Sequence, residues 1–132
     1  AKNLLKQADI DQEVFYAELN WNALMKATRK VDITYQELAK FPAVKRDLAL
    51  LINKEVSFET IEKIAYNTEK KLLKAVELFD VYEGKNLEAG KKSYAVSFTL
   101  QDETKTLNDK AIDKIMSKLI NNLTKQLGAQ LR

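Results

Sequence analysis

The sequence predicts an α+β domain in which two helices cover one face of a four-stranded antiparallel sheet and leave the other face open. Apolar and small residues alternate strictly along residues 91–101. The apolar positions are Tyr94, Val96, Phe98 and Leu100, and the small ones are Ser93, Ala95, Ser97 and Thr99. A period of two with one apolar side is typical of a sheet covered on one face. Residues 57–72 and 108–127 instead carry apolar stripes of helical period.

The alternating stretch is predicted to be the second strand of a hairpin, which comprises strands at 73–83 and 91–101 and a turn at 84–90. In the first of these strands Phe79 and Val81 alternate with Glu77 and Glu83. The opposite side carries Val76, Leu78, Asp80 and Tyr82. We expect that side to belong to the uncovered face, which then combines small residues with an aromatic ring and a carboxylate.

The remaining elements follow from local patterns. Residues 44–52 predict a strand whose Leu48, Leu50 and Ile52 face the core, with Asp47, Ala49 and Leu51 on the other side. Ser57 is a predicted N-cap for a helix that reaches about Leu72. Asn108 is a second predicted N-cap, and Gly128 is suited to a left-handed helix end. Residues 129–131 supply a short last strand, so the order is β-α-β-β-α-β, the ferredoxin-like arrangement.

Residues 40–132 are expected to form this domain, and residues 1–39 to be the tail of an upstream module with a connecting arm. Within that tail, residues 14–19 predict a strand from their aromatic and β-branched content. Residues 21–28 predict a short helix with Asn20 as its N-cap. Pro42, the single proline, marks the entry to the new module, and the absence of an initial Met indicates a piece of a larger protein.

Composition excludes several kinds of site. The chain has no Cys and no His, which removes disulfides, thiolate ligands, cysteine nucleophiles and the usual general base. We therefore expect no catalytic residues and no metal ligands. No apolar run approaches the length of a membrane span and no signal peptide begins the chain, so a cytoplasmic location is expected. The net charge of +3 is compatible with a nucleic-acid partner but argues only weakly for one.

The uncovered face is the candidate site. A ring such as Tyr82 is suited to stack on an unpaired base, and Asp80 to accept hydrogen bonds from the Watson–Crick edge of guanine. Ser93, Ala95 and Ala49 are small enough for a flat base to approach. The basic residues beside the strands are candidates for phosphate contacts, namely Lys45, Arg46, Lys91 and Lys92.

Three other interpretations remain open at this point. Tyr82 could be an ordinary strand tyrosine beside a solvated Asp80. The bare sheet could also be a protein-interaction or dimerisation surface. An acylphosphatase-type enzyme shares the topology, but it would need a phosphate-binding loop with an Arg before the first helix, and residues 53–56 supply none.

Three ordered blocks, Lys40–Ile52, Leu78–Gln101 and Thr106–Leu119, resemble one known domain. It is the C-terminal, ferredoxin-like anticodon-binding domain of the bacterial phenylalanyl-tRNA synthetase beta subunit. The segment Gln12–Ala27 also resembles the end of that subunit's catalytic-like but non-catalytic module.

The resemblance implies that the domain grips the anticodon stem-loop of phenylalanine tRNA. Carried over by motif, Tyr82 would stack on the first anticodon base, a guanine, and Asp80 would accept from its edge. Ser93 and Ala49 would line the same spot. The family also implies an (αβ)₂ holoenzyme whose alpha subunit binds ATP and magnesium. This fragment would hold neither cofactor and would be non-catalytic.

Overall fold

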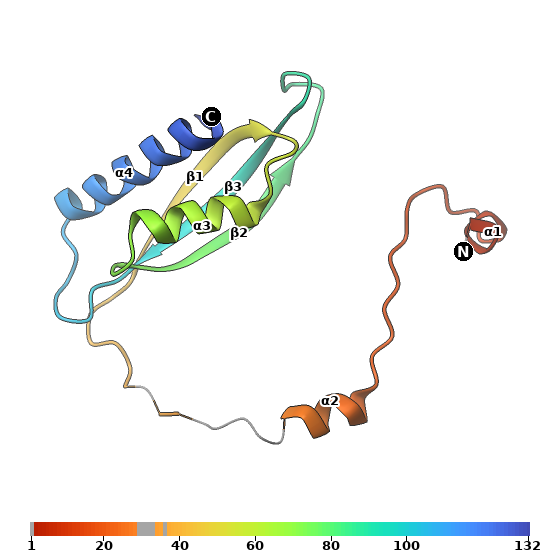
Figure 1. Ribbon diagram of the computed structural model, residues 1–132, viewed down its shortest axis with the longest axis horizontal. Helices are drawn as coiled ribbons and strands as arrows, with labels where there is room; N and C mark the ends of the chain where they lie inside the picture. Colours follow the sequence, from red (N-terminus) through yellow and green to blue (C-terminus); the bar gives the residue numbers. More distant parts are fainter. Residues whose placement is uncertain (1, 29–33, 36) are drawn as a thin grey trace. The chain divides into compact units, whose positions relative to one another are not determined.

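The computed structural model of the chain describes residues 2–28, 34–35 and 37–132. The chain forms two compact units, Ala1–Glu37 and Leu38–Arg132. The second unit contains the sheet and both long helices (Figure 1).

The first unit contains helices α1 (Lys2–Gln7) and α2 (Trp21–Thr28). The predicted α2 is confirmed, and Asn20 caps it by accepting the N–H of Ala23 on its side-chain oxygen at 3.0 Å. α1 was not predicted. The predicted strand at 14–19 is wrong, because these residues have no regular structure and their side chains are exposed. A strand needs a neighbour for its backbone groups, and the described residues of this unit contain no other strand.

The second unit is a four-stranded sheet. Its strands are β1 (Val44–Asn53), β2 (Leu73–Tyr82), β3 (Lys91–Leu100) and β4 (Gln130–Leu131). Their order is β2-β3-β1-β4, and every neighbouring pair is antiparallel. The predicted α+β, ferredoxin-like topology is therefore confirmed, with the predicted strand ends correct to within a residue or so.

Two helices, α3 (Phe58–Thr68) and α4 (Asp109–Leu127), connect the strands. Ser57 Oγ accepts the N–H of Thr60 at 3.3 Å, and Asn108 Oδ1 accepts the N–H of Ala111 at 2.9 Å, so both predicted N-caps are confirmed. Gly128 ends α4 at φ 62°, a left-handed conformation that glycine adopts without a Cβ penalty.

Both helices lie on the same face of the sheet, in front of it in Figure 1. The core between helices and sheet is continuous. Its fully buried members come from β1, α3, β3 and α4, and include Leu50, Ile52, Ile61, Val96, Phe98, Leu100, Leu119 and Leu123. Burial of each such side chain stabilises the fold by about 1.5–3 kcal/mol before its lost conformational entropy is counted. The opposite face of the sheet has no helix over it within this unit.

Strand β2 departs from simple alternation, and this corrects one prediction. Val76 is buried and Leu78 packs against the core, so these two residues lie on the helix-covered face and not on the uncovered one. The pairing with β3 shifts between Leu78 and Asp80, because Leu78 lies opposite Val96 while Asp80 lies opposite Ala95. Phe79 is the extra residue of this β-bulge. A bulge reverses which face the following residues occupy, so Asp80 and Tyr82 return to the open face.

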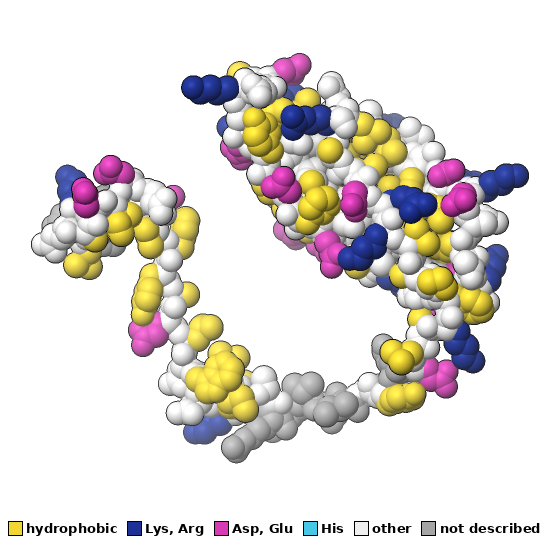
Figure 2. Space-filling model, turned by 180° about the vertical axis from the view of Figure 1, so that it is seen from behind, with side chains coloured by type: hydrophobic (Ala, Val, Ile, Leu, Met, Phe, Trp, Pro, Cys, Tyr) yellow, Lys and Arg dark blue, Asp and Glu magenta, His cyan; other side chains and the backbone are white. Residues whose placement is uncertain are grey.

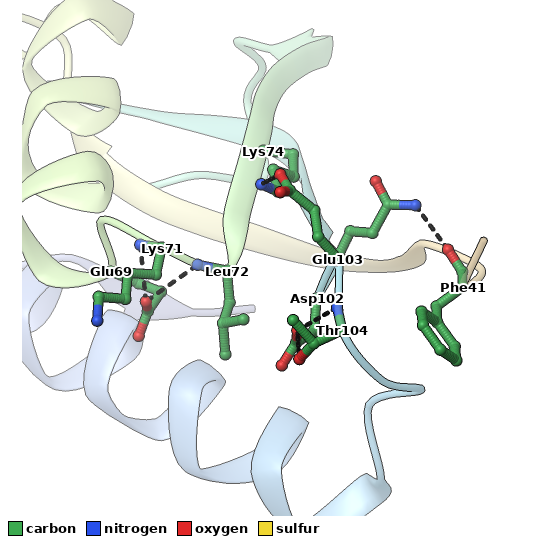
Figure 3. A network of polar contacts seen from close by, with 9 residues as sticks. Phe41, Glu69, Lys71, Leu72, Lys74, Asp102, Glu103 and Thr104 are labelled. Carbon is green, nitrogen blue, oxygen red and sulfur yellow. Dashed lines mark hydrogen bonds and ion pairs between the residues drawn. The ribbon is translucent and has the colours of Figure 1, made fainter. Parts of the chain in front are cut away.

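The turn after α3 explains why this helix is shorter than predicted. α3 ends at Thr68 and not near Leu72. The carboxylate of Glu69 accepts the N–H groups of Lys71 and Leu72, each at 3.1 Å, and holds these residues in a turn that leads into β2 (Figure 3). This side chain gives the backbone an alternative to continued helix.

Polar contacts hold the loops in place at the end of the sheet where β2 begins and β3 ends (Figure 3). Gln101 Nε2 donates to the carbonyl of Phe41 at 2.7 Å, which ties the entry of β1 to the end of β3. Lys74 Nζ lies 2.7 Å from Glu103 Oε1. Exposed ion pairs of this kind contribute about 1 kcal/mol or less, so they fix the loop more than they stabilise the fold.

Asp102 shapes the loop between β3 and α4. Its Oδ1 accepts the backbone N–H of Thr104 at 2.8 Å and the Thr104 hydroxyl at 2.7 Å. The backbone N–H contributes most to lowering the pKa of Asp102 below its ordinary value of 3.8, and the hydroxyl contributes next. Hydrogen bonds to the ionised carboxylate therefore favour the folded loop above that ordinary value, and this contribution is lost as the pH falls through the lowered pKa.

We predict that NMR titration of the 132-residue chain gives Asp102 a pKa below 3.8. The substitution Thr104→Ala removes only the hydroxyl, so the pKa of Asp102 should rise part of the way back while the backbone bond remains. The pKa of Glu59, which its hydrogen bond with Lys63 lowers, provides the comparison and should not respond to Thr104→Ala. A pKa of Asp102 at or above its ordinary value would contradict this account of the loop.

Candidate functional site

The open face is organised in rows of residues that lie opposite one another on neighbouring strands. Directly paired residues of antiparallel strands share a face. One row runs from Asp80 on β2 to Ala95 on β3 and Ala49 on β1. The next row runs from Tyr82 to Ser93 and Leu51. Figure 2 looks onto this face, opposite to the helices of Figure 1, and shows apolar side chains with single acidic and basic ones between them.

Within these rows Ala49, Ala95 and Ser93 form a low floor, and the larger Leu51, Asp80 and Tyr82 border it. Ala49 and Ala95 are direct partners and have no side-chain atoms beyond Cβ. Ser93 beside them is 6% exposed, so its short side chain does not stand out from the floor. Tyr82 and Asp80 rise from the β2 side. The arrangement accommodates a planar group that lies over the alanines and has its edge toward Asp80.

The carboxylate of Asp80 can accept hydrogen bonds from the edge of such a planar group. Its Oδ1 accepts the N–H of the next residue, Val81, at 2.8 Å. This bond holds the carboxylate in place at the bulge. An ionised carboxylate has two oxygens and about four acceptor positions, so Oδ2 remains able to accept donors from a ligand.

The ring of Tyr82 owes its position to Gly84. A Cβ added at Gly84 would lie 2.4 Å from the phenol oxygen and 2.5 Å from Cζ of Tyr82. No side chain fits there unless the ring moves. From the sequence, Gly84 is expected only to begin the turn at 84–90, and this role is not predicted.

Arg132 is a second residue that the sequence analysis missed. Its backbone N–H donates to the carbonyl of Ala49 at 2.9 Å, which places it beside the alanine floor. Its guanidinium carbon lies 5.3 Å from the centroid of the Tyr82 ring. A cation over an exposed aromatic ring stabilises by about 0.5–1 kcal/mol. No sequence motif indicates this contact, because it joins the two edge strands of the sheet.

The basic residues that were predicted to contact phosphates lie on different faces of the sheet. Lys45 lies opposite Thr99 on the open face, and its Nζ is 3.0 Å from Glu77 Oε2. Arg46 lies opposite the core residue Phe98, and its guanidinium is 3.9 Å from Asp109 at the start of α4. The structure therefore places Arg46 on the helix-covered face.

Lys92 also lies on the helix-covered face, because its partner on β1 is the core residue Ile52. It is 7% exposed, and its Nζ lies 4.5 Å from the centroid of the Tyr94 ring. The structure thus brings together Tyr82, Asp80, Ser93, Ala49 and Lys45 on one face, and does not bring Arg46 or Lys92 to it. Phosphate contacts by Arg46 and Lys92 stay a prediction.

Phe79 adds a second aromatic ring to the open side. It is 60% exposed, and it borders a shallow depression of about 280 Å³ together with Lys45, Asp47, Glu77 and Ser97. The sequence analysis placed Phe79 on the side opposite to Tyr82. Only the bulge brings both rings to the same side.

The charge of this face is mixed. Lys45, Lys91 and Arg132 are accompanied by Asp47, Glu77 and Asp80. The acids equal the bases in number among these six side chains, so the face is better suited to base edges and rings than to a run of phosphates. Within residues 2–28, 34–35 and 37–132, no group of three or more potential metal ligands comes together. In the same part of the chain, every helix is too short or too polar to cross a membrane.

Comparison with known proteins gives a consistent result. The model of the ferredoxin-fold anticodon binding domain matches residues 39–132. The phenylalanine–tRNA ligase beta subunit of Bacteroides thetaiotaomicron is 74% identical over 131 residues, which are 99% of this chain and 16% of that protein. The same subunit of Porphyromonas gingivalis is 58% identical over 129 residues, again 16% of its length. The chain therefore spans about a sixth of the length of the curated relatives it matches.

We predict that Gly84→Ala displaces the Tyr82 ring and leaves the core intact. The added Cβ would collide with the end of a side chain that can rotate, so the cost in unfolding free energy should be about 1 kcal/mol or less. The ring-current shifts that Tyr82 produces on the Arg132 side chain should shrink in NMR spectra. Ala89→Gly changes the same turn without touching the ring and serves as control. Unchanged Arg132 shifts in Gly84→Ala would contradict the role assigned to Gly84.

Proposed function

Since the chain belongs to the ferredoxin-fold anticodon binding domain family, we propose that its open face binds the anticodon stem-loop of phenylalanine tRNA. The observation that carries the proposal is the joint position of Tyr82 and Asp80 beside the Ala49–Ala95 floor. A single unpaired base fits this arrangement, with its ring against the phenol and its edge toward the carboxylate. Ser93 and Lys45 lie on the same face, where they would border the bound loop.

Guanine is the base that the carboxylate favours. Its Watson–Crick edge presents two adjacent N–H donors, whereas adenine presents an acceptor at the corresponding ring position. A carboxylate accepts hydrogen bonds from the two donors of guanine, but it is repelled by the ring acceptor of adenine. Single-stranded loops leave such edges free, and proteins commonly read RNA in this way. The first anticodon base, a guanine in this family's tRNA, is therefore the proposed occupant.

The wider setting is part of the proposal. The relatives are beta subunits of a ligase that joins phenylalanine to its tRNA, and we place this chain in such a subunit, within an (αβ)₂ holoenzyme in the cytoplasm. The described residues offer no cluster of metal ligands. Within the same proposal, and on the family resemblance alone, ATP and magnesium are assigned to the alpha subunit. This chain would contribute tRNA recognition and no catalytic group.

Removal of the stacking ring is the first test. In Tyr82→Ala, the affinity of the chain for a phenylalanine anticodon stem-loop should fall by about 1–3 kcal/mol, the usual contribution of base–aromatic stacking. Isothermal titration calorimetry measures it directly. Tyr82→Phe should retain most of the affinity because the ring remains. Tyr66→Ala is a matched control, since Tyr66 is also 37% exposed but lies on α3 on the covered side.

Equal affinities of the wild type and Tyr82→Ala would remove Tyr82 from the site. A wild-type chain that binds no stem-loop at all would overturn the proposed function itself.

The second test concerns base preference. Wild-type chain should discriminate against a stem-loop with adenine in place of the first anticodon guanine by about 1–3 kcal/mol, as expected for a two-donor contact. In Asp80→Ala the two stem-loops should bind about equally, because the acceptor is gone. Asp113→Ala, on α4, should leave the discrimination intact. If Asp80→Ala weakens both stem-loops but keeps the preference, Asp80 does not read the base.

One observation favours a second candidate, a protein-interaction or dimerisation surface. Phe79 is 60% exposed on β2, an edge strand of the sheet. Exposed aromatic residues on sheet edges are common at protein interfaces. Light scattering after size-exclusion chromatography separates the two candidates. A stable dimer that dissociates on Phe79→Ala, in a chain that retains no stem-loop, would support this alternative.

A further inference from the structure

We infer that Arg132 is an RNA-binding residue. In the free chain its guanidinium lies over the Tyr82 ring, and when RNA binds it moves to a phosphate of the bound nucleotide. This inference rests on the proposed function and extends it to a residue outside the sequence pattern. Arg132 continues the β4 strand beside Ala49, to which its backbone N–H is bonded at 2.9 Å. From there its guanidinium reaches Tyr82 at the other edge of the sheet.

The path of this side chain crosses the proposed base site. The strand order β2-β3-β1-β4 puts β1 and β3 between Arg132 and Tyr82. The residues of these strands in the Asp80 row are Ala49 and Ala95. The backbone of Arg132 lies beside Ala49 and its guanidinium ends 5.3 Å from the Tyr82 ring centroid, so the side chain spans the face between them. It occupies the volume that a base stacked on Tyr82 would take.

A base would displace this guanidinium readily. Stacking of a base on an aromatic ring is the stronger of the two interactions, and a cation–π contact at an exposed site is the weaker. The backbone of Arg132 remains bonded to Ala49 during the exchange. The displaced guanidinium thus stays within reach of whatever nucleotide takes its place.

Charge determines where the guanidinium goes. Lys45, on the same face, pairs with Glu77, and Arg46, on the covered face, lies near Asp109. Among the described residues, no carboxylate lies within ion-pair distance of the Arg132 side chain. A guanidinium binds phosphate through two parallel hydrogen bonds, and each bound base brings a phosphate with it. Among the cations of this face, Arg132 is the one whose guanidinium lies against the Tyr82 ring, so it is well placed to hold the backbone of a nucleotide bound there.

The test measures stem-loop affinity against salt for the wild type, Arg132→Ala and Lys63→Ala. The salt concentration is varied from about 50 to about 200 mM. Over this range each phosphate contact adds to the slope of log affinity against log salt. At the lowest salt concentration, Arg132→Ala should reduce the affinity about five- to tenfold. It should also make the slope of log affinity against log salt shallower by about 0.7–1. Lys63→Ala removes a positive charge from α3, on the covered side of the sheet, and should change neither quantity. Thermal unfolding of each variant checks that the fold is kept.

NMR of the free wild-type chain gives an independent readout. The Arg132 side-chain resonances should carry a ring-current shift that disappears in Tyr82→Ala and on addition of the stem-loop. Unchanged affinity and slope in Arg132→Ala would overturn the inference, and so would increased affinity, since Arg132 would then only block the ring. In both cases the wild type still binds RNA and the proposed function stands. Absence of binding by the wild type would instead overturn the proposed function.

Discussion

The bulge at Phe79 is the constraint on which the candidate site depends. Before it, Val76 and Leu78 fill the core under the helices. After it, Asp80 lies opposite Ala95 and Tyr82 opposite Ser93, both on the open face. Without the extra residue, one strand could not supply apolar side chains to the core and then a carboxylate and a phenol to the other face at these positions. A single irregularity in pairing thus separates the stabilising half of β2 from its functional half.

The site itself is assembled across strands and not along one of them. β1 and β3 give the alanine floor, β2 gives the acid and the ring, and β4 brings Arg132 from the opposite edge. Each contribution depends on the register of the sheet, since a slip of one residue would turn every side chain of a strand to the other face. The core packing that fixes this register, centred on Phe98 and Val96, is therefore also what positions the site.

The distribution of charge indicates how such a surface would work. Its bases and its acids are mixed, and Lys45 is already paired with Glu77. Attraction for phosphates is consequently modest, and discrimination would depend on stacking and on the edge of one base. Arg132 fits this scheme as a single mobile cation. A domain that reads one nucleotide and adds little general affinity for RNA is suited to work as part of a larger tRNA-binding surface.

The sequence by itself determined the element order, both helix caps, the left-handed glycine after α4 and the alternation of β3, because these depend on residues close together in the chain. It also indicated Tyr82, Asp80, Ser93 and Ala49 as a group. Alternation along β1 and β3 already separates Arg46 and Lys92 from Lys45, whereas the faces of Val76, Leu78 and Phe79 were decided only by the tertiary structure. The contact of Arg132 with Tyr82 was likewise invisible in the sequence. Strand pairing and bulges set these features, and both arise from contacts between residues far apart in the chain, which local patterns do not encode.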